Sequence, residues 1–594
     1  MSNIQQLITE NLDIWANAIK PKKAVGRGRG KNGNGKYELY GIKKLRELIL
    51  ELAVRGLLVP QDPNDEPACE LLKKIAAEKE QLVKEKKIKK QKTLSPIRDE
   101  EKPFKLPNGW AWGRLKEICL LENGDRSKNY PNKSLLVESG VPFVNAGHLQ
   151  NGRVNKGDMT FITEERFDLL KAGKFVDGDI LFCLRGSLGK SAIVEGFSKG
   201  AIASSLVIIR LLGTLNNYYF HNYFDSPFSY RMITLYDNGT AQPNLSAADL
   251  GKFLVPMPPL EEQHHIVAKV DELMALCDQL EQQTETSITA HQTLVETVLE
   301  ALTCPSAANE LDASAIFFEH FDTLFTTEHS IDQLKQAILQ LAVMGKLVPQ
   351  DPFAEPASEL LKKIAAKKEK LIKEKKIKKQ KVQSEIADNE KSFSLPVGWE
   401  CRRFVDLVDE VATGPFGSMI HKSDYIDGGV PLINPSHMIE GRITCDTSIS
   451  VSNQKAVELK SYRLFAGDIV MARRGEMGRC ALVEDLHENW LCGTGSFVLR
   501  FHSEICRAYV LLLFKTDGVR SYLGGNSVGS TMTNLNHGIL NKMPILIPPA
   551  AEQHRIVAKV NQLMTFCDQL KQHLVDSKTT QLHLADAIAE QAVA

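Results

Sequence analysis

The sequence predicts an α+β protein made of two similar halves. Each half would hold an α/β domain with a β-rich core, and long antiparallel coiled-coil helices would join and space the two domains. First, a stretch that begins LVPQDP occurs twice, at residues 58–92 and 347–381, with six differences. Second, short apolar runs broken by Gly, Asn and Asp follow each copy, as expected for strands and loops. Third, each half ends in an apolar heptad pattern. So long a period indicates a duplicated half-protein with a pseudo-two-fold axis rather than a solenoid.

Composition places the chain among large soluble proteins. It has 594 residues, of which 43% are hydrophobic and 25% charged, and its 73 basic residues balance its 73 acidic ones. Its eleven cysteines form no CxxC pair, which is typical of reduced thiols. The N-terminus lacks a signal-peptide pattern, and no apolar run approaches the length of a membrane span. We therefore expect a cytoplasmic protein that has no membrane partner.

The repeat suggests five consecutive regions. We expect an N-terminal helical region with a basic glycine-rich loop, a first globular domain, a central helical region, a second globular domain and a C-terminal coiled-coil helix, at residues 1–105, 106–257, 258–394, 395–547 and 548–594.

The N-terminal region should contain two helices. Apolar residues at helical spacing predict the first over Tyr40 to about Gly56, with the glycine as its stop signal. The second is expected from about Pro67 to Lys92, and it ends in the lysine-rich run KEKKIKKQK. Such a run is more commonly a solvated helix face than a contact with the DNA backbone. The loop 20–36, with seven basic and no acidic residues, is equally consistent with a solvated linker and with a nonspecific contact to phosphate.

Each globular domain passes through Pro-Pro into a long helix whose apolar positions alternate in steps of four and three. The two helices would pack against each other along this seam. Its main positions are Ile266, Val270, Leu273 and Leu280 in the first copy and Ile556, Val560, Leu563 and Leu570 in the second. Continuing the count places Ser287, Leu294, Ser577 and Leu584 on the same seam.

Motifs for nucleotide or cofactor chemistry are incomplete. The segment 186–191 resembles a phosphate-binding loop, but Leu184 stands where that motif needs a glycine, and the second copy lacks the Lys and the Ser. Residues 434–437 (Asn-Pro-Ser-His) lack the second proline and the aromatic ring of adenine methyltransferases. Glu261 and Glu262 beside two histidines are better explained by electrostatics at a helix start than by a metal. We therefore predict no catalytic or metal-binding residues.

A duplicated Arg-Gly-x-x-Gly-Lys/Arg loop is the best candidate for DNA contact. A basic loop between two strands can direct arginine toward a phosphate or a guanine edge. The alternative is a hairpin whose glycines serve the turn and whose cations are solvated. With the neighbouring divergent loops, the candidate DNA-binding residues are Arg126, Lys128, Asn129, Lys133, Arg185, Lys190, Gln242 and Asn244 in the first half and Ser418, His421, Lys422, Arg473, Arg474, Arg479 and Asn534 in the second.

These features together resemble the specificity subunit of a type I restriction–modification enzyme, and in particular the type IB group (EcoAI/EcoEI-like). The segments that carry the resemblance span nearly the whole chain: YGIKKLRELILELAVRG, LVPQDP, LPNGW and LPVGW, GTAQPNLS, and PPLEEQHHIV. The second copy of GTAQPNLS reads GSTMTNLN and keeps only its Gly and Asn-Leu.

The resemblance implies two target-recognition domains, each reading one half of a bipartite, asymmetric site in double-stranded DNA. The helices would set the spacer and dock two modification subunits, with two restriction subunits completing the complex. This chain would bind no cofactor, whereas its partners would use S-adenosylmethionine, ATP and Mg²⁺ for N6-adenine methylation or restriction. Two alternatives stay open: a coiled-coil adaptor without DNA specificity, and an enzyme in its own right, which the missing motifs disfavour.

Overall fold

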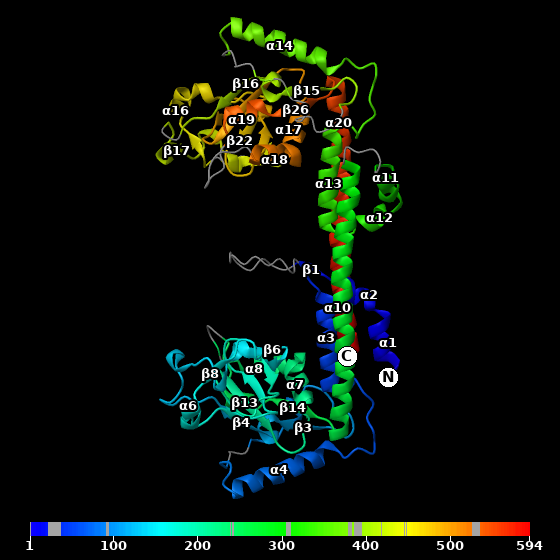
Figure 1. Ribbon diagram of the computed structural model, residues 1–594, viewed down its shortest axis with the longest axis vertical. Helices are drawn as coiled ribbons and strands as arrows, with labels where there is room; N and C mark the ends of the chain where they lie inside the picture. Colours follow the sequence, from blue (N-terminus) through cyan, green and yellow to red (C-terminus); the bar gives the residue numbers. More distant parts are fainter. Residues whose placement is uncertain are drawn as a thin grey trace. The chain divides into compact units, whose positions relative to one another are not determined.

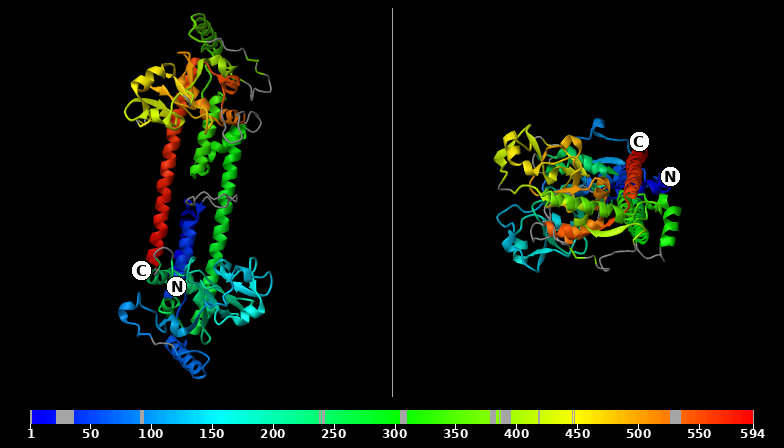
Figure 2. Two further views of the ribbon diagram at one scale, coloured as in Figure 1. Left: turned by 90° about the vertical axis from the view of Figure 1, so that its left-hand side faces the viewer. Right: turned by 90° about the horizontal axis from the view of Figure 1, so that it is seen from above.

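A computed structural model shows two compact units (Figures 1 and 2). The first unit comprises Met1–Ser287 with Ser577–Ala594, and the second Ile288–Asp576. The C-terminal residues thus belong to the first unit, although they end the second half of the sequence. The structure describes residues 2–21, 37–90, 94–237, 239, 243–303, 310–377, 383–384, 386, 395–416, 419–444, 446, 448–525 and 535–593.

The first unit mixes helices and sheets. Its helices are α1 (Ser2–Glu10), α2 (Leu12–Asn17), α3 (Tyr40–Arg55), α4 (Ala68–Lys84), α5 (Leu115–Ile118), α6 (Glu164–Leu169), α7 (Asn217–Asp225), α8 (Pro227–Tyr236), α9 (Ala247–Leu250) and the start of α10 (Leu260–Thr303). Its strands are β1 (Lys20–Pro21), β2 (Tyr37–Glu38), β3 (Ala111–Arg114), β4 (Cys119–Asn123), β5 (Val141–Val144), β6 (Leu149–Gln150), β7 (Gly152–Val154), β8 (Thr160–Ile162), β9 (Lys174–Phe175), β10 (Ile180–Cys183), β11 (Ser191–Ile193), β12 (Gly200–Ile202), β13 (Leu206–Leu211) and β14 (Leu254–Met257).

The second unit repeats this plan. Its helices are α11 (Glu310–Glu319), α12 (Phe321–Leu324), α13 (Glu328–Val343), α14 (Ala357–Lys373), α15 (Phe404–Leu407), α16 (Asn453–Glu458), α17 (Arg507–Lys515), α18 (Asp517–Gly525), α19 (His537–Lys542) and most of α20 (Ala550–Val593). Its strands are β15 (Glu400–Arg403), β16 (Val408–Thr413), β17 (Tyr425–Ile426), β18 (Val430–Ile433), β19 (Met438–Ile439), β20 (Arg442–Ile443), β21 (Ser450–Val451), β22 (Ile469–Ala472), β23 (Cys480–Leu482), β24 (Leu491–Cys492), β25 (Ser496–Phe501) and β26 (Pro544–Ile547).

A three-helix bundle in the first unit consists of α3, the start of α10 and the end of α20. Tyr40 at the start of α3 donates a hydrogen bond to Asp586 (2.6 Å), and Arg55 at its end donates to the carbonyl of Val593 (2.9 Å), so α3 runs parallel to α20. Arg46 contacts Glu281, whereas Gln61 beyond the end of α3 contacts Glu262, so α3 runs antiparallel to α10. It follows that α10 and α20 are antiparallel, as the sequence predicts.

The second unit builds an equivalent bundle with the helices exchanged. Here α13 takes the place of α3, and it packs between the start of α20 and the end of α10. The Lys335 ammonium lies 2.5 Å from Asp568, and Lys571 lies 3.0 Å from Asp332. The predicted stop of α3 is confirmed as well, because Gly56 caps that helix in the left-handed conformation, with φ of 70°.

The seam of the long helices follows the prediction along their first half and again at Val298 and Ile588, which the same heptad count assigns to it and which pack against the cores. Ile266, Val270, Leu273, Ile556 and Val560 are buried, and Leu280, Leu563 and Leu570 are partly buried against the same cores. Beyond them, the prediction for Ser287, Leu294, Ser577 and Leu584 is wrong. Leu294 and Leu584 are 50% and 43% exposed, whereas their neighbours Val295 and Ala585 are 1% and 0% exposed.

The physical reason is a change of register in both helices. The inward positions step by four twice in succession, 280–284–288 and 570–574–578, which shifts the seam by one residue. In each helix this shift coincides with the boundary where the chain leaves one unit for the other, at residues 287/288 and 576/577. The buried positions of each long helix shift where the helix leaves the bundle of one unit and joins the bundle of the other, since it then packs against a different short helix, α3 or α13.

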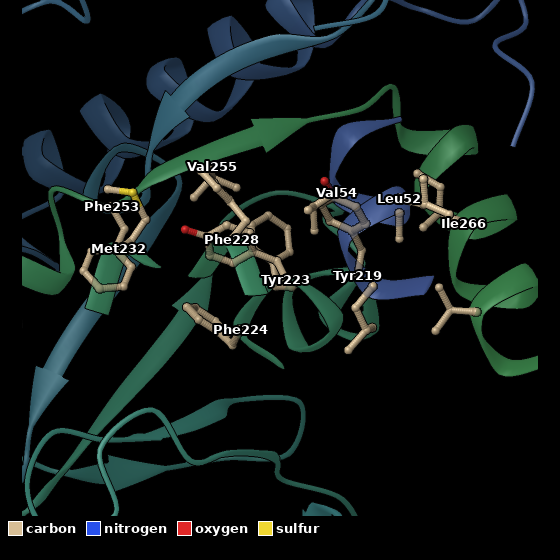
Figure 3. Packing of buried hydrophobic residues seen from close by; sticks show 14 of the residues in the cluster. Leu52, Val54, Tyr219, Tyr223, Phe224, Phe228, Met232, Phe253, Val255 and Ile266 are labelled. Atoms are coloured by element: carbon tan, nitrogen blue, oxygen red, sulfur yellow. The ribbon is translucent and has the colours of Figure 1, made fainter. Parts of the chain in front are cut away.

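The sheets of each unit continue the apolar core of its helix bundle. In the first unit, β4-β13-β10-β11-β7-β6 form one sheet and β8-β5-β12-β9 another. In the second unit the corresponding sheets are β16-β25-β22-β23 and β17-β21-β18-β24. Figure 3 shows how aromatic side chains of α7 and α8, including Tyr219, Tyr223 and Phe228, pack between Val255 of β14 and Leu52 of α3. One apolar core therefore joins the six-stranded sheet of the first unit to α3 and α10.

The predicted extent of the lysine-rich helix is wrong. Helices α4 and α14 end at Lys84 and Lys373 rather than continuing through the run. Lys86 and Lys375 adopt left-handed backbone conformations, with φ of 58° and 57°, which ends an α-helix. Residues 91–93 and 378–382, and 22–36 of the basic loop, lie outside the described residues. Over the described part of the chain, no helix is both long and apolar enough to cross a membrane.

Candidate nucleic-acid interface

One end of the six-stranded sheet gathers the basic loops of the first unit. Strand β13 pairs with β4 on one side and β10 on the other, so that Val207 lies opposite Asn123 and Leu206 opposite Cys183. The loops that follow β4 and β10 therefore leave the sheet at the same end. This end, which we call the loop edge, carries Arg126, Lys128 and Lys133 from one loop and Arg185 from the other, all of them exposed.

Arg185 is oriented by a second duplicated motif. Its Nε donates a hydrogen bond to Oδ1 of Asn244, 59 positions away, at 2.9 Å, and the two residues form an isolated antiparallel bridge. Next to it, the Leu245 amide donates to the Leu184 carbonyl at 3.0 Å. The glycines of the loop, Gly186 and Gly189, have φ of 80° and 87°, which other residues rarely adopt. The Arg-Gly loop and the Asn-Leu segment thus form one structure, with the arginine exposed at its surface.

The second unit has the same loop edge. Strand β25 places Phe497 opposite Thr413 and Ser496 opposite Ala472, so that the loops after β16 and β22 again leave together. The Leu535 amide donates to the Arg473 carbonyl at 2.9 Å, which matches the Leu245 contact of the first unit. Arg474 is exposed at the position that corresponds to Arg185.

Besides Arg185 and Asn244, four more of the candidate residues are engaged within the protein. Lys190 donates to the Ala146 carbonyl at 3.3 Å, and Arg479 to the Pro435 carbonyl at 3.4 Å, so both tie the Arg-Gly loop to a neighbouring turn. The Asn129 amide donates to the Leu169 carbonyl at 3.0 Å. The Arg473 guanidinium lies 4.9 Å from the Phe497 ring centroid, and burial lowers its pKa. These residues shape the loop edge more than they project from it.

The other candidates divide between the surface and the undescribed segments. His421 and Lys422 are exposed on the loop after β16. Gln242, Ser418 and Asn534 lie outside the described residues.

Two further residues of the loop edge were missed from the sequence. Asp237 Oδ1 accepts a hydrogen bond from the Asn244 backbone amide at 2.8 Å and so fixes the residue that orients Arg185. The Asp-Asn-Gly sequence at 237–239 is a turn signal from which this residue could have been predicted. His537 Nε2 lies 2.7 Å from Thr413 Oγ1, and no sequence signal joins two residues that far apart.

Glu261 and Glu262 lie in the first turn of α10, as expected, and Glu262 also accepts buried hydrogen bonds. Glu262 is 1% exposed and accepts hydrogen bonds from the Trp110 indole (2.9 Å) and the Gln61 amide (3.1 Å). In the second unit Glu552 accepts from Gln350 at 3.0 Å. Three duplicated motifs, LVPQDP, LPNGW and PPLEEQ, therefore meet at one buried carboxyl, whose pKa is raised by burial. No group of three or more His, Cys, Asp or Glu within the described residues is arranged to hold a metal ion.

Replacing Glu262 by alanine should destabilise the first unit. The Trp110 indole would lose its buried acceptor, which costs about 1–3 kcal/mol, whereas Gln61 keeps its bonds to the Gly56 and Val59 carbonyls. Thermal unfolding of Glu262→Ala and Glu262→Gln would measure the effect. The glutamine variant keeps one carbonyl acceptor and should lose less. Equal losses in both variants would show that the charge, and not the acceptor, is what matters.

Comparison with known proteins identifies the family. The model of the type I restriction modification DNA specificity domain matches residues 107–290 and 396–576. The specificity subunit of the type I restriction enzyme EcoEI from Escherichia coli is 39% identical over 623 residues, covering 99% of this chain and 100% of that one. The EcoAI specificity subunit, also from Escherichia coli, is 39% identical over 618 residues and covers 100% of both chains.

Among solved structures, the HsdS subunit from Thermoanaerobacter tengcongensis aligns with a TM-score of 0.41 and 18% identity, covering 83% of this chain and 98% of that one. The two matched segments together span more than half of the chain, and the two Escherichia coli relatives match along their full length. The resemblance seen in the sequence is therefore confirmed: this chain belongs to the family of type I restriction enzyme specificity subunits.

Proposed function

We propose that this chain gives a type I restriction–modification complex its DNA sequence specificity, with each recognition domain reading one half of a bipartite, asymmetric site. The observation that carries the proposal is the loop edge, present once in each unit. In both, the same Arg-Gly loop stands beside the same Asn-Leu segment, while the loops around it differ in sequence. A common scaffold that carries divergent loops is suited to two domains that recognise two different half-sites.

The long helices support the rest of the proposal. A helix of 44 residues spans about 66 Å at 1.5 Å per residue, and the chain has two of that length, α10 and α20. We infer that they set the spacer between the half-sites and dock two modification subunits, to which two restriction subunits are added. The chain itself would be noncatalytic and required for the activity of the complex. S-adenosylmethionine, ATP and Mg²⁺ would belong to the partner subunits, and the complex would act on DNA in the cytoplasm.

A map of N6-methyladenine in host DNA, with the gene present and deleted, tests this function. We expect one split motif, with two half-sites at a fixed gap, to lose its methylation completely when the gene is deleted. Restoring the gene on a plasmid should restore the same motif. An unchanged map, with the modification subunit expressed in both strains, would contradict the proposal and favour the adaptor without DNA specificity.

A further inference from the structure

A basic groove runs along the outer side of α4 in the first unit. It encloses a volume of about 490 Å³ and is lined by five lysines and two glutamates around an apolar floor. Lys84, Lys89 and Lys90 are exposed at its rim, while Val83, Ile88 and Leu94 contribute to its floor. The groove therefore offers two kinds of contact: an apolar floor for an apolar side chain and a cationic rim for acidic groups.

A left-handed turn at the end of α4 brings Ile88 into the groove. Lys86 adopts the left-handed conformation that costs a residue with a Cβ about 1 kcal/mol or more. The turn lets the Ile88 amide donate to the Leu82 carbonyl at 3.3 Å, which brings Ile88 back beside the helix. The second unit repeats this turn at Lys375, where the Ile377 amide donates to the Leu371 carbonyl at 3.4 Å. The strained turn is thus retained in both copies.

The position of the groove separates it from the loop edge. Lys79 of α4 donates to the carbonyls of Lys116 and Cys119, and Cys119 begins β4. The loop edge begins beyond Asn123, at the other end of the same strand. In Figure 1, α4 accordingly lies beside β3 and β4, on the side of the domain away from β6 and α8. A duplex read at the loop edge would not follow this groove.

The lysine-rich sequence that lines the groove recurs in the second half of the chain. Residues 84–90 and 373–379 both read KEKKIKK, although the loops of the two loop edges have diverged. Seven of the eleven lining positions carry the same residue in the second copy, whereas Leu94 and Lys116 correspond to Gln383 and Val405. The repeated part is the lysine-rich run with its isoleucine, which therefore carries the chemistry that the proposal uses.

We propose that the groove beside α4 docks an acidic segment of a partner protein, with an apolar side chain inserted at Ile88. The cationic rim pairs with carboxylates, and the apolar floor takes an anchoring side chain, which a phosphate backbone does not provide. The lysine-rich sequence recurs at residues 373–379, and we expect it to serve a second copy of the same segment. This inference rests on the proposed function in one respect: the partner is taken to be a subunit of the type I restriction–modification complex.

The test compares two charge reversals on the same helix region of the full-length chain. Lys84→Glu/Lys90→Glu changes the rim of the groove, and Lys73→Glu/Lys74→Glu changes two exposed lysines of α4 that do not line it. Binding to the purified modification and restriction subunits and to a duplex without the recognition site would be measured separately. We expect the rim variant to bind one of the two subunits about tenfold or more weakly, and the control variant to bind as the parent does.

A photoreactive residue at position 88 in the assembled complex provides the second measurement. Mass spectrometry should locate its cross-link in an acid-rich segment of the same subunit. The proposal fails if the rim variant loses only its binding to the duplex, because the groove would then be a DNA surface. It also fails if the rim variant binds both subunits as the parent does and the residue at position 88 forms no cross-link to either. A failure here would still leave a split motif whose methylation depends on the gene, whereas failure of the proposed function would leave the methylation map unchanged when the gene is deleted.

Discussion

Arg185→Ala is expected to remove recognition of one half-site and to leave the other readable. The Nε of Arg185 is occupied by Asn244, so the exposed end of the guanidinium is held toward the loop edge with little freedom. A bidentate arginine–guanine pair discriminates by about 1–3 kcal/mol, equivalent to roughly 5- to 150-fold in affinity. The assembled complex, titrated with duplexes altered in one half-site at a time, would report the loss.

The second unit offers a matched control. Arg474→Ala should have the same effect on the opposite half-site, because Arg474 occupies the equivalent exposed position. Arg185→Lys separates base reading from charge, since lysine keeps the cation but loses the planar fork. If Arg185→Ala instead weakens binding to both half-sites equally and lowers the salt dependence, the residue contacts phosphate and reads no base.

Much of the fold follows from local patterns that the sequence displays openly. The duplication, α3 with its stop at Gly56 and the first half of each long helix depend on spacing and on one turn residue. The shift of the buried seam cannot be predicted from such local patterns, because Leu294 and Val295 are both apolar and the heptad count favours Leu294. Only the partner helix, supplied by the other half of the chain, decides which of the two is buried.

The loop edge was predictable in its parts but not in its assembly. A basic loop between two strands identifies Arg185, and the Gly…Asn-Leu segment is visible as a second repeat. That Asn244 orients Arg185 requires the tertiary contact across 59 positions. Charge alone also misassigns residues: Lys190 and Arg479 look like free cations in the sequence, yet they bond carbonyls of adjacent turns. For the lysine-rich run, a left-handed turn at Lys86 overrides a helix-forming composition.

Ala585→Asp is expected to unfold the C-terminal helix from the first unit. Ala585 is 0% exposed, and it contacts the core that α3 and α10 form. A carboxylate at that place would be buried without a cation, which typically costs 3 kcal/mol or more, or about two orders of magnitude in the local equilibrium. The bonds of Asp586 with Tyr40 and of Val593 with Arg55 should be lost with the packing.

The neighbouring residue supplies the control for this change. Leu584 is 43% exposed, so Leu584→Asp should be nearly neutral, although the heptad count assigns Leu584 to the seam. Hydrogen exchange of the whole chain would distinguish the two variants, with amides of α3 exchanging faster in Ala585→Asp and those of α13 unchanged. Faster exchange in α13 would mean that the last residues stabilise the second unit, their own half of the sequence. Protection lost only in α3 would show that the end of the chain completes the first unit, which therefore needs a helix from the second half of the sequence to fold fully.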